Sequence, residues 1–305
     1  MSELYKKYRP SKFKDVLGQL DAARSLNEMV KKRQVPHTIL FIGPSGCGKT
    51  TLARILVNKL KASPSDVVEM NSSNYRGIDS IRDIQNRISL APVAGDCRIW
   101  IMDECHQLTG AAQDAFLKIL EDTPEHVYFF LATTDPAKLK KTIKTRATEI
   151  RVNLLDNETM KKLLDSVIDK ERLEVSDLVV DRIIEYSEGS ARKGLVLLNH
   201  VISVTDEDRQ LELVVNSNDR AVGFEIAQML FNKSTKWKDI ASKLKTLGDE
   251  PETVRHIVMS YAETILLNSG NGFAFSVMNI FCDPFFNNKR KDLTMACFEV
   301  LNMER

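Results

Sequence analysis

The sequence predicts an α/β domain built on a parallel sheet, followed by two smaller all-helical domains. In the first half, short apolar runs rich in β-branched and aromatic residues alternate with helix-like stretches, a pattern typical of a parallel sheet covered on both faces. A glycine-rich motif separates the first of these runs from a helix-like stretch. After residue 152 the strand-like runs stop, while apolar residues at three- and four-residue spacing continue.

The individual elements follow from the same patterns. We expect strands at Thr38–Ile42, Val67–Met70, Arg98–Met102, Val127–Thr133 and Thr148–Val152, with helices between them at Thr50–Lys61, Ile78–Ile88 and Gly110–Glu121. Further helices are expected at Asn157–Glu171, Leu178–Ser187, Ala191–Val204, Arg220–Phe231, Trp237–Leu247, Thr253–Leu267 and Leu293–Leu301. Turns are expected at Gly189-Ser190, Asp206-Glu207-Asp208 and Gly270-Asn271-Gly272. The predicted domains are residues 1–152, 153–205 and 206–305.

Composition excludes several classes of protein. The 305 residues are 43% hydrophobic and 28% charged, as in ordinary globular proteins, and are numerous enough to bury cores without disulfides. No apolar run approaches the roughly 18 residues of a membrane span, and the basic N-terminus lacks an apolar signal core, so we expect a cytoplasmic protein without membrane contact. The five cysteines form no C-x-x-C pair, which favours reduced thiols over disulfides or zinc.

Charge divides the chain into two unlike halves. Residues 1–152 hold 24 Lys and Arg against 17 Asp and Glu, whereas the remainder holds 19 against 25. A basic half suits a polyanionic partner such as nucleic acid, although many basic domains bind none.

One motif carries a specific chemistry. The stretch Gly43-Pro44-Ser45-Gly46-Cys47-Gly48-Lys49-Thr50 matches G-x-x-x-x-G-K-[ST] and lies between an expected strand and helix. Its glycines permit a tight turn whose N–H groups face phosphate oxygens at the positive end of the next helix. We expect Lys49 to reach the β- and γ-phosphates of ATP, Thr50 to bind Mg²⁺, and Thr51 to complete the nucleotide site.

A pair of acids, Asp103 and Glu104, ends an expected buried strand. Asp103 suits the metal side of the site and Glu104 suits polarisation of the attacking water. Alternatively, the pair only begins a helix, where acids are favoured. A P-loop kinase would use the same phosphate cradle, but an acid following the metal-side aspartate favours hydrolysis.

Several motifs together resemble the ATPase subunits of sliding-clamp loaders, which are AAA+ proteins of DNA replication. They are Tyr8-Arg9-Pro10, Val16-Leu17-Gly18-Gln19, the P-loop, Asp103-Glu104-Cys105-His106 and Leu131-Ala132-Thr133-Thr134-Asp135-Pro136. The chain is similar to the bacterial gamma/tau subunit from Asp103 to Arg151, and in its compact length to small replication factor C subunits or phage counterparts. The resemblance implies a AAA+ P-loop domain, a helical lid and a collar-like third domain.

The resemblance also implies site residues. Thr134 matches the sensor 1 residue beside the γ-phosphate, and Arg192 matches the sensor 2 arginine of the lid. Arg146, in Lys144-Thr145-Arg146-Ala147, occupies the place of the arginine that enters a neighbouring subunit's site, although the family's Ser and Cys are replaced by Thr and Ala. Residues matching the wall around the adenine are Tyr8, Arg9, Pro10, Val16 and Leu17. Residues matching the DNA-facing element within Asn71–Ile88 are Arg76, Arg82 and Arg87.

The gamma/tau pattern usually carries a cysteine-rich zinc insert after the P-loop helix, and Lys59–Val68 contains no cysteine, so no zinc module is expected. Cys105 and His106 have no second ligand pair nearby, and a metal role for them is therefore not expected either.

We therefore expect an ATPase subunit that opens a sliding clamp and releases it on primer-template DNA. The expected partners are the clamp, the DNA and other clamp-loader subunits in a pentameric ring, in a bacterial or phage-infected cell. The alternatives are a helicase motor or helicase loader on the same fold, and a scaffold subunit that binds ATP without turnover.

Overall fold

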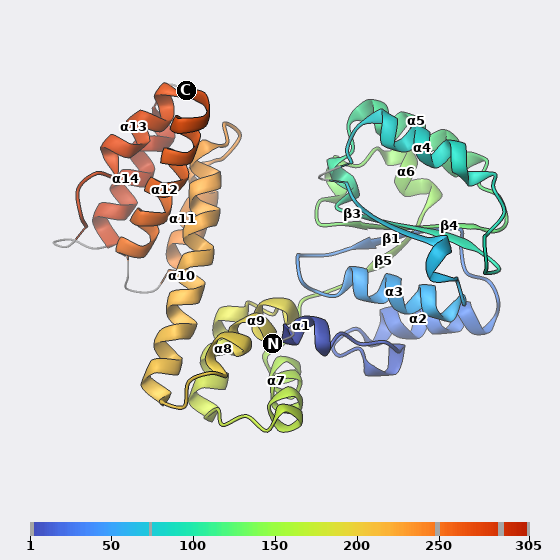
Figure 1. The fold of residues 1–305 in the computed structure, drawn as a ribbon, viewed down its shortest axis with the longest axis horizontal. Helices are drawn as coiled ribbons and strands as arrows, with labels where there is room; N and C mark the ends of the chain where they lie inside the picture. Colours follow the sequence, from blue (N-terminus) through green and yellow to red (C-terminus); the bar gives the residue numbers. More distant parts are fainter. Residues whose placement is uncertain (1–2, 73–74, 248–250, 286–289, 304–305) are drawn as a thin grey trace. The chain divides into compact units, whose positions relative to one another are not determined.

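A computed structural model describes residues 3–72, 75–247, 251–285 and 290–303 (Figure 1). The chain forms two compact units. The first runs to Arg172 and includes Ser187–Val196, and the second consists of Leu173–Tyr186 and the chain from Leu197 onward. The boundaries between these units differ from the predicted domain boundaries, which follow residues 152 and 205. The division into three domains therefore stays a prediction.

The first unit is built on a five-stranded parallel sheet. Its strands are β1 (Thr38–Ile42), β2 (Val67–Asn71), β3 (Arg98–Asp103), β4 (Val127–Thr133) and β5 (Thr148–Arg151). Their order is β2-β3-β4-β1-β5, and every neighbouring pair is parallel. The carboxyl ends of β1, β3 and β4 therefore meet at one edge, where open parallel sheets bind ligands. All five expected strands are confirmed to within one residue.

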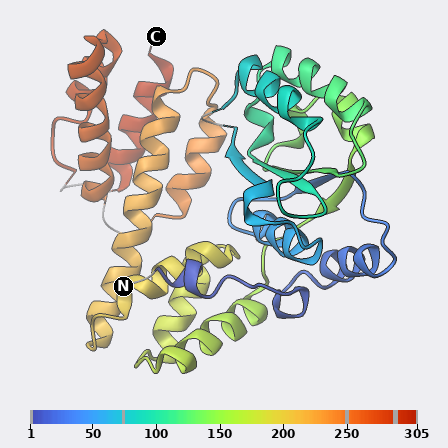
Figure 2. The same ribbon diagram turned by 45° about the vertical axis from the view of Figure 1, so that its right-hand side comes forward.

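Helices cover both faces of this sheet, as expected (Figures 1 and 2). On one face are α2 (Leu20–Lys31) and α3 (Lys49–Lys59); on the other are α4 (Ile78–Ile88), α5 (Gly110–Glu121) and α6 (Lys141–Arg146). Alternation of side chains along the strands sends Ile39 and Phe41 into the first core and Leu40 into the second. Because both faces are covered, β1 is apolar at almost every position.

Short elements complete the first unit. They are α1 (Leu4–Lys7), α7 (Asn157–Glu171), the start of α9 (Ala191–Val201), and the 3-10 turns Phe13–Asp15, Pro64–Asp66, Cys105–Gln107 and Pro136–Lys138. Asp156 caps α7 by accepting the Thr159 N–H. Gly189 has a φ of +76°, and a Cβ there would come within 2.6 Å of the Leu155 carbonyl oxygen. Only glycine fits this turn into α9.

Among the described residues of the second unit, the regular elements are all helices. Its helices are α8 (Asp177–Ser187, of which Ser187 counts with the first unit), the remainder of α9, α10 (Glu207–Phe231), α11 (Trp237–Lys245), α12 (Pro251–Ser269), α13 (Gly272–Ile280) and α14 (Arg290–Asn302). Buried residues of α10 to α14 form one apolar core. Within the described ranges, no helix combines the length and apolar character needed to cross a bilayer.

The predicted turn at residues 206–208 is wrong. Asp206 is the N-cap of α10, its side chain accepts the Arg209 N–H, and Glu207 and Asp208 form the first helical turn. Acidic side chains stabilise a helix N-terminus, so the acidic run starts the helix rather than interrupting it. The turn predicted at Gly270 is confirmed, and Asn271 there caps α13, a helix that the sequence patterns did not predict.

Candidate active site

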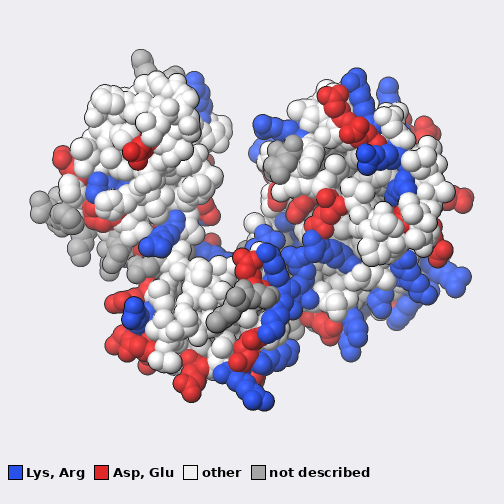
Figure 3. All heavy atoms as spheres, viewed as in Figure 1, with Lys and Arg blue, Asp and Glu red and all other residues white. Residues whose placement is uncertain are grey.

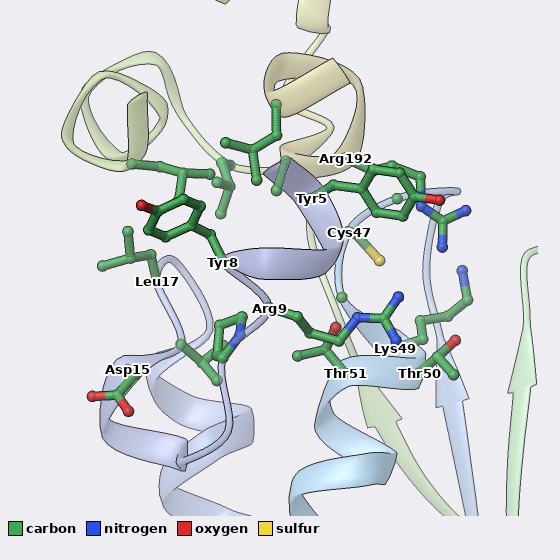
Figure 4. A pocket seen from close by; sticks show the side chains of 18 of the residues that line it. Tyr5, Tyr8, Arg9, Asp15, Leu17, Cys47, Lys49, Thr50, Thr51 and Arg192 are labelled. Carbon is green, nitrogen blue, oxygen red and sulfur yellow. The ribbon is translucent and has the colours of Figure 1, made fainter. Parts of the chain in front are cut away.

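A cavity of about 390 Å³ opens in the first unit between the glycine-rich turn, the N-terminal segment, α7 and the start of α9 (Figure 4). That volume is within the usual range of about 300 to 1,000 Å³ for small-molecule sites. Most of the predicted nucleotide and acid residues line it. They are Tyr8, Arg9, Pro10, Val16, Leu17, Ser45, Gly46, Cys47, Gly48, Lys49, Thr50, Thr51, Asp103, Glu104 and Arg192.

The glycines of the turn between β1 and α3 are required by the backbone. Gly46 and Gly48 have φ values of +73° and +111°, a region that other residues rarely adopt. A Cβ on Gly43 would come within 2.0 Å of the carbonyl oxygen of Val152, the residue that follows β5. The turn therefore lies tightly against the sheet edge, and α3 begins at Lys49 with its N-terminus toward the cavity.

Lys49 and Thr50 point into this cavity from the first turn of α3 (Figure 4). The buried Lys49 Nζ donates to the carbonyl oxygens of Gly43 (2.8 Å) and Pro44 (2.7 Å). The Thr50 hydroxyl donates to Asp103 Oδ2 at 3.2 Å. A hydroxyl and a carboxylate side by side are hard oxygen ligands, so these two residues fit Mg²⁺.

Glu104 follows Asp103 at the end of β3, in the left-handed region with a φ of +51°. Its backbone N–H donates to Asp103 Oδ1 at 3.0 Å, and its Oε2 accepts the Thr134 hydroxyl hydrogen at 2.9 Å. Thr134 follows β4 directly and does not line the cavity. The strand order brings these residues together, because β3 and β4 are neighbours in the sheet.

Cations outnumber carboxylates in the cavity wall. Arg9, Lys49, Lys170 and Arg192 face it, as do the three carboxylates Asp15, Asp103 and Glu104. Burial, followed by the charges of Arg54 and Arg192, lowers the pKa of Arg9. A cluster of cations that repel one another favours binding of a polyanion.

Some lining residues were not predicted from the sequence. These are Tyr5, Asp15, Leu155, Leu163, Ser166, Val167, Lys170, Ala191 and Leu195. The Arg192 guanidinium lies over the Tyr5 ring, 5.6 Å from its centroid. Lys170 Nζ lies 5.6 Å from the centroid of Tyr8, whose hydroxyl donates to Glu171. That hydrogen bond raises the pKa of Tyr8.

Besides Thr134, three predicted nucleotide or catalytic residues lie away from the cavity wall. Gly43 and Pro44 line a second hollow of about 420 Å³ behind the turn, with Lys144 and Arg151. Arg146, at the end of α6, is absent from both walls and forms an ion pair with Glu121, with Nη2 2.5 Å from Oε1. Within one chain, Arg146 therefore does not belong to the nucleotide cavity.

The three arginines predicted to face DNA are exposed. Arg76 precedes α4, Arg82 pairs with Asp79 at 3.0 Å on the surface of α4, and Arg87 is in its last turn. The predicted segment Asn71–Ile88 also contains Ser73 and Asn74, which lie outside the described residues. Lys and Arg atoms gather on the α/β part of the chain in the view of Figure 3, in line with the basic composition of residues 1–152.

The described residues hold no group of three or more His, Cys, Asp or Glu side chains that could bind a metal ion together. All five cysteines are free thiols. Burial raises the pKa of Cys47, so this thiol in the glycine-rich turn is a packing group rather than a nucleophile.

Two family matches and a set of relatives agree with this geometry. Residues 61–156 match the family described as DNA polymerase III, delta subunit, and residues 12–94 match magnesium chelatase, subunit ChlI. The DNA polymerase III subunit gamma/tau of Mycobacterium tuberculosis (strain ATCC 25618 / H37Rv) is 35% identical over 66% of this chain and 39% of its own length. The chain is related to the gamma/tau subunits of bacterial DNA polymerase III. The resemblance inferred from the motifs is thereby confirmed.

Other relatives of this gamma/tau-like chain align along nearly all of it. Subunit tau of Bacillus subtilis (strain 168) is 26% identical over 98% of this chain and 58% of its own length. Subunit gamma of Buchnera aphidicola is 25% identical over 98% of the chain and 91% of its own length. The chain thus spans between about two fifths and three fifths of the Mycobacterium and Bacillus relatives.

Solved structures share the fold of the gamma/tau-like chain. The RuvB Holliday junction branch migration motor of Thermotoga maritima aligns with a TM-score of 0.59 and 20% identity, over 86% of this chain and 91% of the motor. At that identity the likeness shows the fold alone. The predicted class, an α/β P-loop ATPase fold with helical domains, is confirmed.

Proposed function

We propose that the chain is an ATPase subunit of a sliding-clamp loader, which uses ATP to open a clamp and load it on primer-template DNA. The observation that carries this proposal is the meeting of Lys49, Asp103 and Glu104 in one cavity of a gamma/tau-like chain. The basic cavity wall supports a triphosphate as the ligand.

The P-loop residues would hold the phosphates. The Lys49 ammonium group donates hydrogen bonds to two carbonyl oxygens of the turn. It lies beside the start of α3, where it could also donate to phosphate oxygens. Thr50 and Asp103 would hold Mg²⁺, whose charge neutralises the phosphates when it is bound. Tyr8, Pro10 and Leu17 offer the apolar wall for the base, and Arg192 offers a lid cation.

Glu104 is the group that we assign to the attacking water. Thr134 fixes one oxygen of its carboxylate, and the carboxylate faces the cavity beside Asp103. A fixed carboxylate can orient a water and accept its proton. This assignment makes the chain an ATPase rather than a phosphoryl-transfer enzyme with a second substrate.

Arg146 supports a ring of subunits. Its guanidinium is exposed and does not line the cavity of its own chain. It could therefore contact a nucleotide only in the cavity of a neighbouring subunit. An arginine supplied from a neighbour stabilises charge on a transferring phosphoryl group. We infer a ring with other clamp-loader subunits, five in number, in which Arg76, Arg82 and Arg87 contact the DNA backbone.

The test is ATP hydrolysis by the chain with its companion subunits, measured with the clamp, with primer-template DNA, with both and with neither. A clamp loader hydrolyses fastest with both. Hydrolysis stimulated by DNA alone, together with strand separation, would support the helicase alternative. Tight ATP binding without turnover under all four conditions would support a scaffold subunit. No finding favours the helicase alternative over the clamp loader.

A further inference from the structure

His106 is a buried histidine whose ring contacts Glu104, and the nucleotide motifs give it no role. It is 8% exposed and lies in the 3-10 turn Cys105–Gln107 that follows the acid pair. Its Nδ1 lies 3.0 Å from Thr133 Oγ1 and 3.3 Å from Glu104 Oε2. Its Nε2 lies 3.0 Å from the side-chain nitrogen of Gln107. Both ring nitrogens therefore have partners.

These partners fix the tautomer of the neutral ring. The Gln107 amide nitrogen can only donate, so the His106 Nε2 that it faces accepts. The ring proton is then on Nδ1, where it faces two oxygens. Thr133 Oγ1 already accepts the backbone N–H of Asp135 at 3.0 Å and has a second lone pair for the His106 proton.

The contacts of the Glu104 carboxylate with Thr134 and His106 all involve one of its two oxygens. Its Oε2 accepts from Thr134 and lies 3.3 Å from His106 Nδ1, which also contacts Thr133 Oγ1 at 3.0 Å. Its Oε1 has no hydrogen bond to any of the residues described. One oxygen of the carboxylate is thus fixed, and the other is available in the cavity that Glu104 lines.

The backbone also ties His106 to Glu104. The Glu104 carbonyl accepts the Gln107 N–H at 2.8 Å, which closes the turn, and Cys105 is buried beneath it. The hydrogen-bonded turn and the buried Cys105 restrict the backbone on both sides of His106. The imidazole ring is therefore kept close to the Glu104 carboxylate.

We propose that His106 is a positioning residue for hydrolysis, which donates its Nδ1–H to Glu104 and Thr133 and so leaves Glu104 Oε1 to orient the attacking water. The inference rests on the proposed ATPase function. It assigns to the His106 side chain a hydrogen-bonding role in turnover and none in nucleotide affinity, because His106 does not line the cavity.

Two substitutions separate hydrogen bonding from packing. In His106→Asn, the amide Nδ2 is as many bonds from the backbone as Nδ1 of histidine and can donate to Glu104. In His106→Gln, the amide nitrogen corresponds to Nε2 and turns away from Glu104. His126→Gln is the matched control, because the His126 ring contacts the Leu90 carbonyl oxygen at 3.1 Å and does not line the cavity.

The kcat of clamp- and DNA-stimulated hydrolysis is measured for each variant, with nucleotide affinity and thermal midpoint. We expect His106→Gln to lower kcat on the order of 10-fold with unchanged affinity, and His106→Asn to restore it to within about 3-fold of the parent. His126→Gln should leave kcat unchanged. The proposal is overturned if the Gln variant keeps the parent kcat, or if the Asn variant is as slow as the Gln variant at the same thermal midpoint.

A second readout does not depend on turnover. Nuclear magnetic resonance of isotopically labelled histidine rings reports which ring nitrogen carries the proton. We expect His106 to carry it on Nδ1, and Glu104→Gln to shift the Nδ1 signal. A proton on Nε2 would overturn the proposal. An inactive parent protein with the proton on Nδ1 would instead count against the ATPase function while supporting the contact.

Discussion

Glu104 has a strained backbone conformation and a side chain that is fixed by a hydrogen bond. A non-glycine residue in the left-handed region costs about 1 kcal/mol, and Glu104 is in that region with a φ of +51°. Hydrogen bonds from its own N–H to Asp103 and from Thr134 to its carboxylate hold it there. Strain kept in place at the end of a buried strand is typical of a functional residue.

Replacing Glu104 by Gln should separate ATP binding from hydrolysis. The amide keeps the size of the side chain but accepts a proton poorly, so we expect turnover to fall about 100-fold or more while nucleotide affinity is retained. Glu125→Gln, an exposed change away from the cavity, should leave both unchanged. Stimulated hydrolysis at the parent rate in Glu104→Gln would show that another group serves the water.

The sequence was sufficient for site residues that are consecutive or follow a strand. Lys49, Thr50 and Asp103 could be assigned because their motifs fix their places at the sheet edge. Tyr5 and Lys170 could not, because α1 is too short to show a pattern and the spacing of α7 shows an apolar face but not what it packs against. Only tertiary packing brings them to the P-loop.

Among the elements, the connection from α4 to β3 depends on one buried carboxylate. Asp66 ends the 3-10 turn before β2 and accepts the backbone N–H groups of Val93 (2.6 Å), Ala94 (3.0 Å) and Gly95 (3.1 Å). The Arg98 guanidinium lies 3.6 Å from it. The hydrogen bond from Val93, followed by those from its neighbours, lowers the pKa of Asp66 below its ordinary value of 3.8.

This lowered pKa predicts a specific pH dependence of stability. Because the folded protein holds the ionised form, the stabilisation is complete above the ordinary value of 3.8 and is lost as the pH falls further, through the folded pKa. Asp66→Asn should lower the thermal midpoint by several degrees near neutral pH, and the difference from the parent should shrink in acid. Asp83→Asn, at an exposed position of α4, is the control. A difference that stays constant down to strong acid would contradict the assignment.

The elements themselves were predicted well where the pattern is strong. The strands are apolar because both faces are buried, and α4, α5 and α7 have the bounds that the sequence predicted. The helix α6 was not predicted, since its six residues are too few to show apolar spacing, and α2 was missed although its apolar residues have helical spacing. The start of α10 was set 13 residues too late, because its acidic first turn resembles a surface turn.

At the scale of the whole molecule, the proposed ring would complete the nucleotide site of each chain with Arg146 of a neighbouring subunit. Arg146 is exposed at the end of α6 and is paired only with Glu121 and the Thr142 carbonyl oxygen among the residues described. An exposed pair of this kind contributes little to stability. In the proposed ring, exchanging Glu121 for the phosphates of a neighbouring subunit would therefore cost Arg146 little.

Arg146→Ala should spare nucleotide binding and remove stimulated hydrolysis. Arginines supplied from a neighbour contribute on the order of 10³-fold or more to turnover, so the assembled complex should lose nearly all of its clamp- and DNA-dependent rate. Lys141→Ala, at an exposed position of the same helix, is the control. Unchanged turnover in the Arg146 variant would mean that no neighbour uses this residue.

The central claim is that the cavity beside the glycine-rich turn binds magnesium-ATP through Lys49. The most direct measurement is a titration of the purified chain with a fluorescent ATP analogue and Mg²⁺, for the parent, Lys49→Ala and the exposed control Lys59→Ala. The account predicts saturable binding of one nucleotide per chain in the parent and the control, and none in Lys49→Ala. Absence of saturable binding in the parent, or equal affinity in Lys49→Ala, would contradict it.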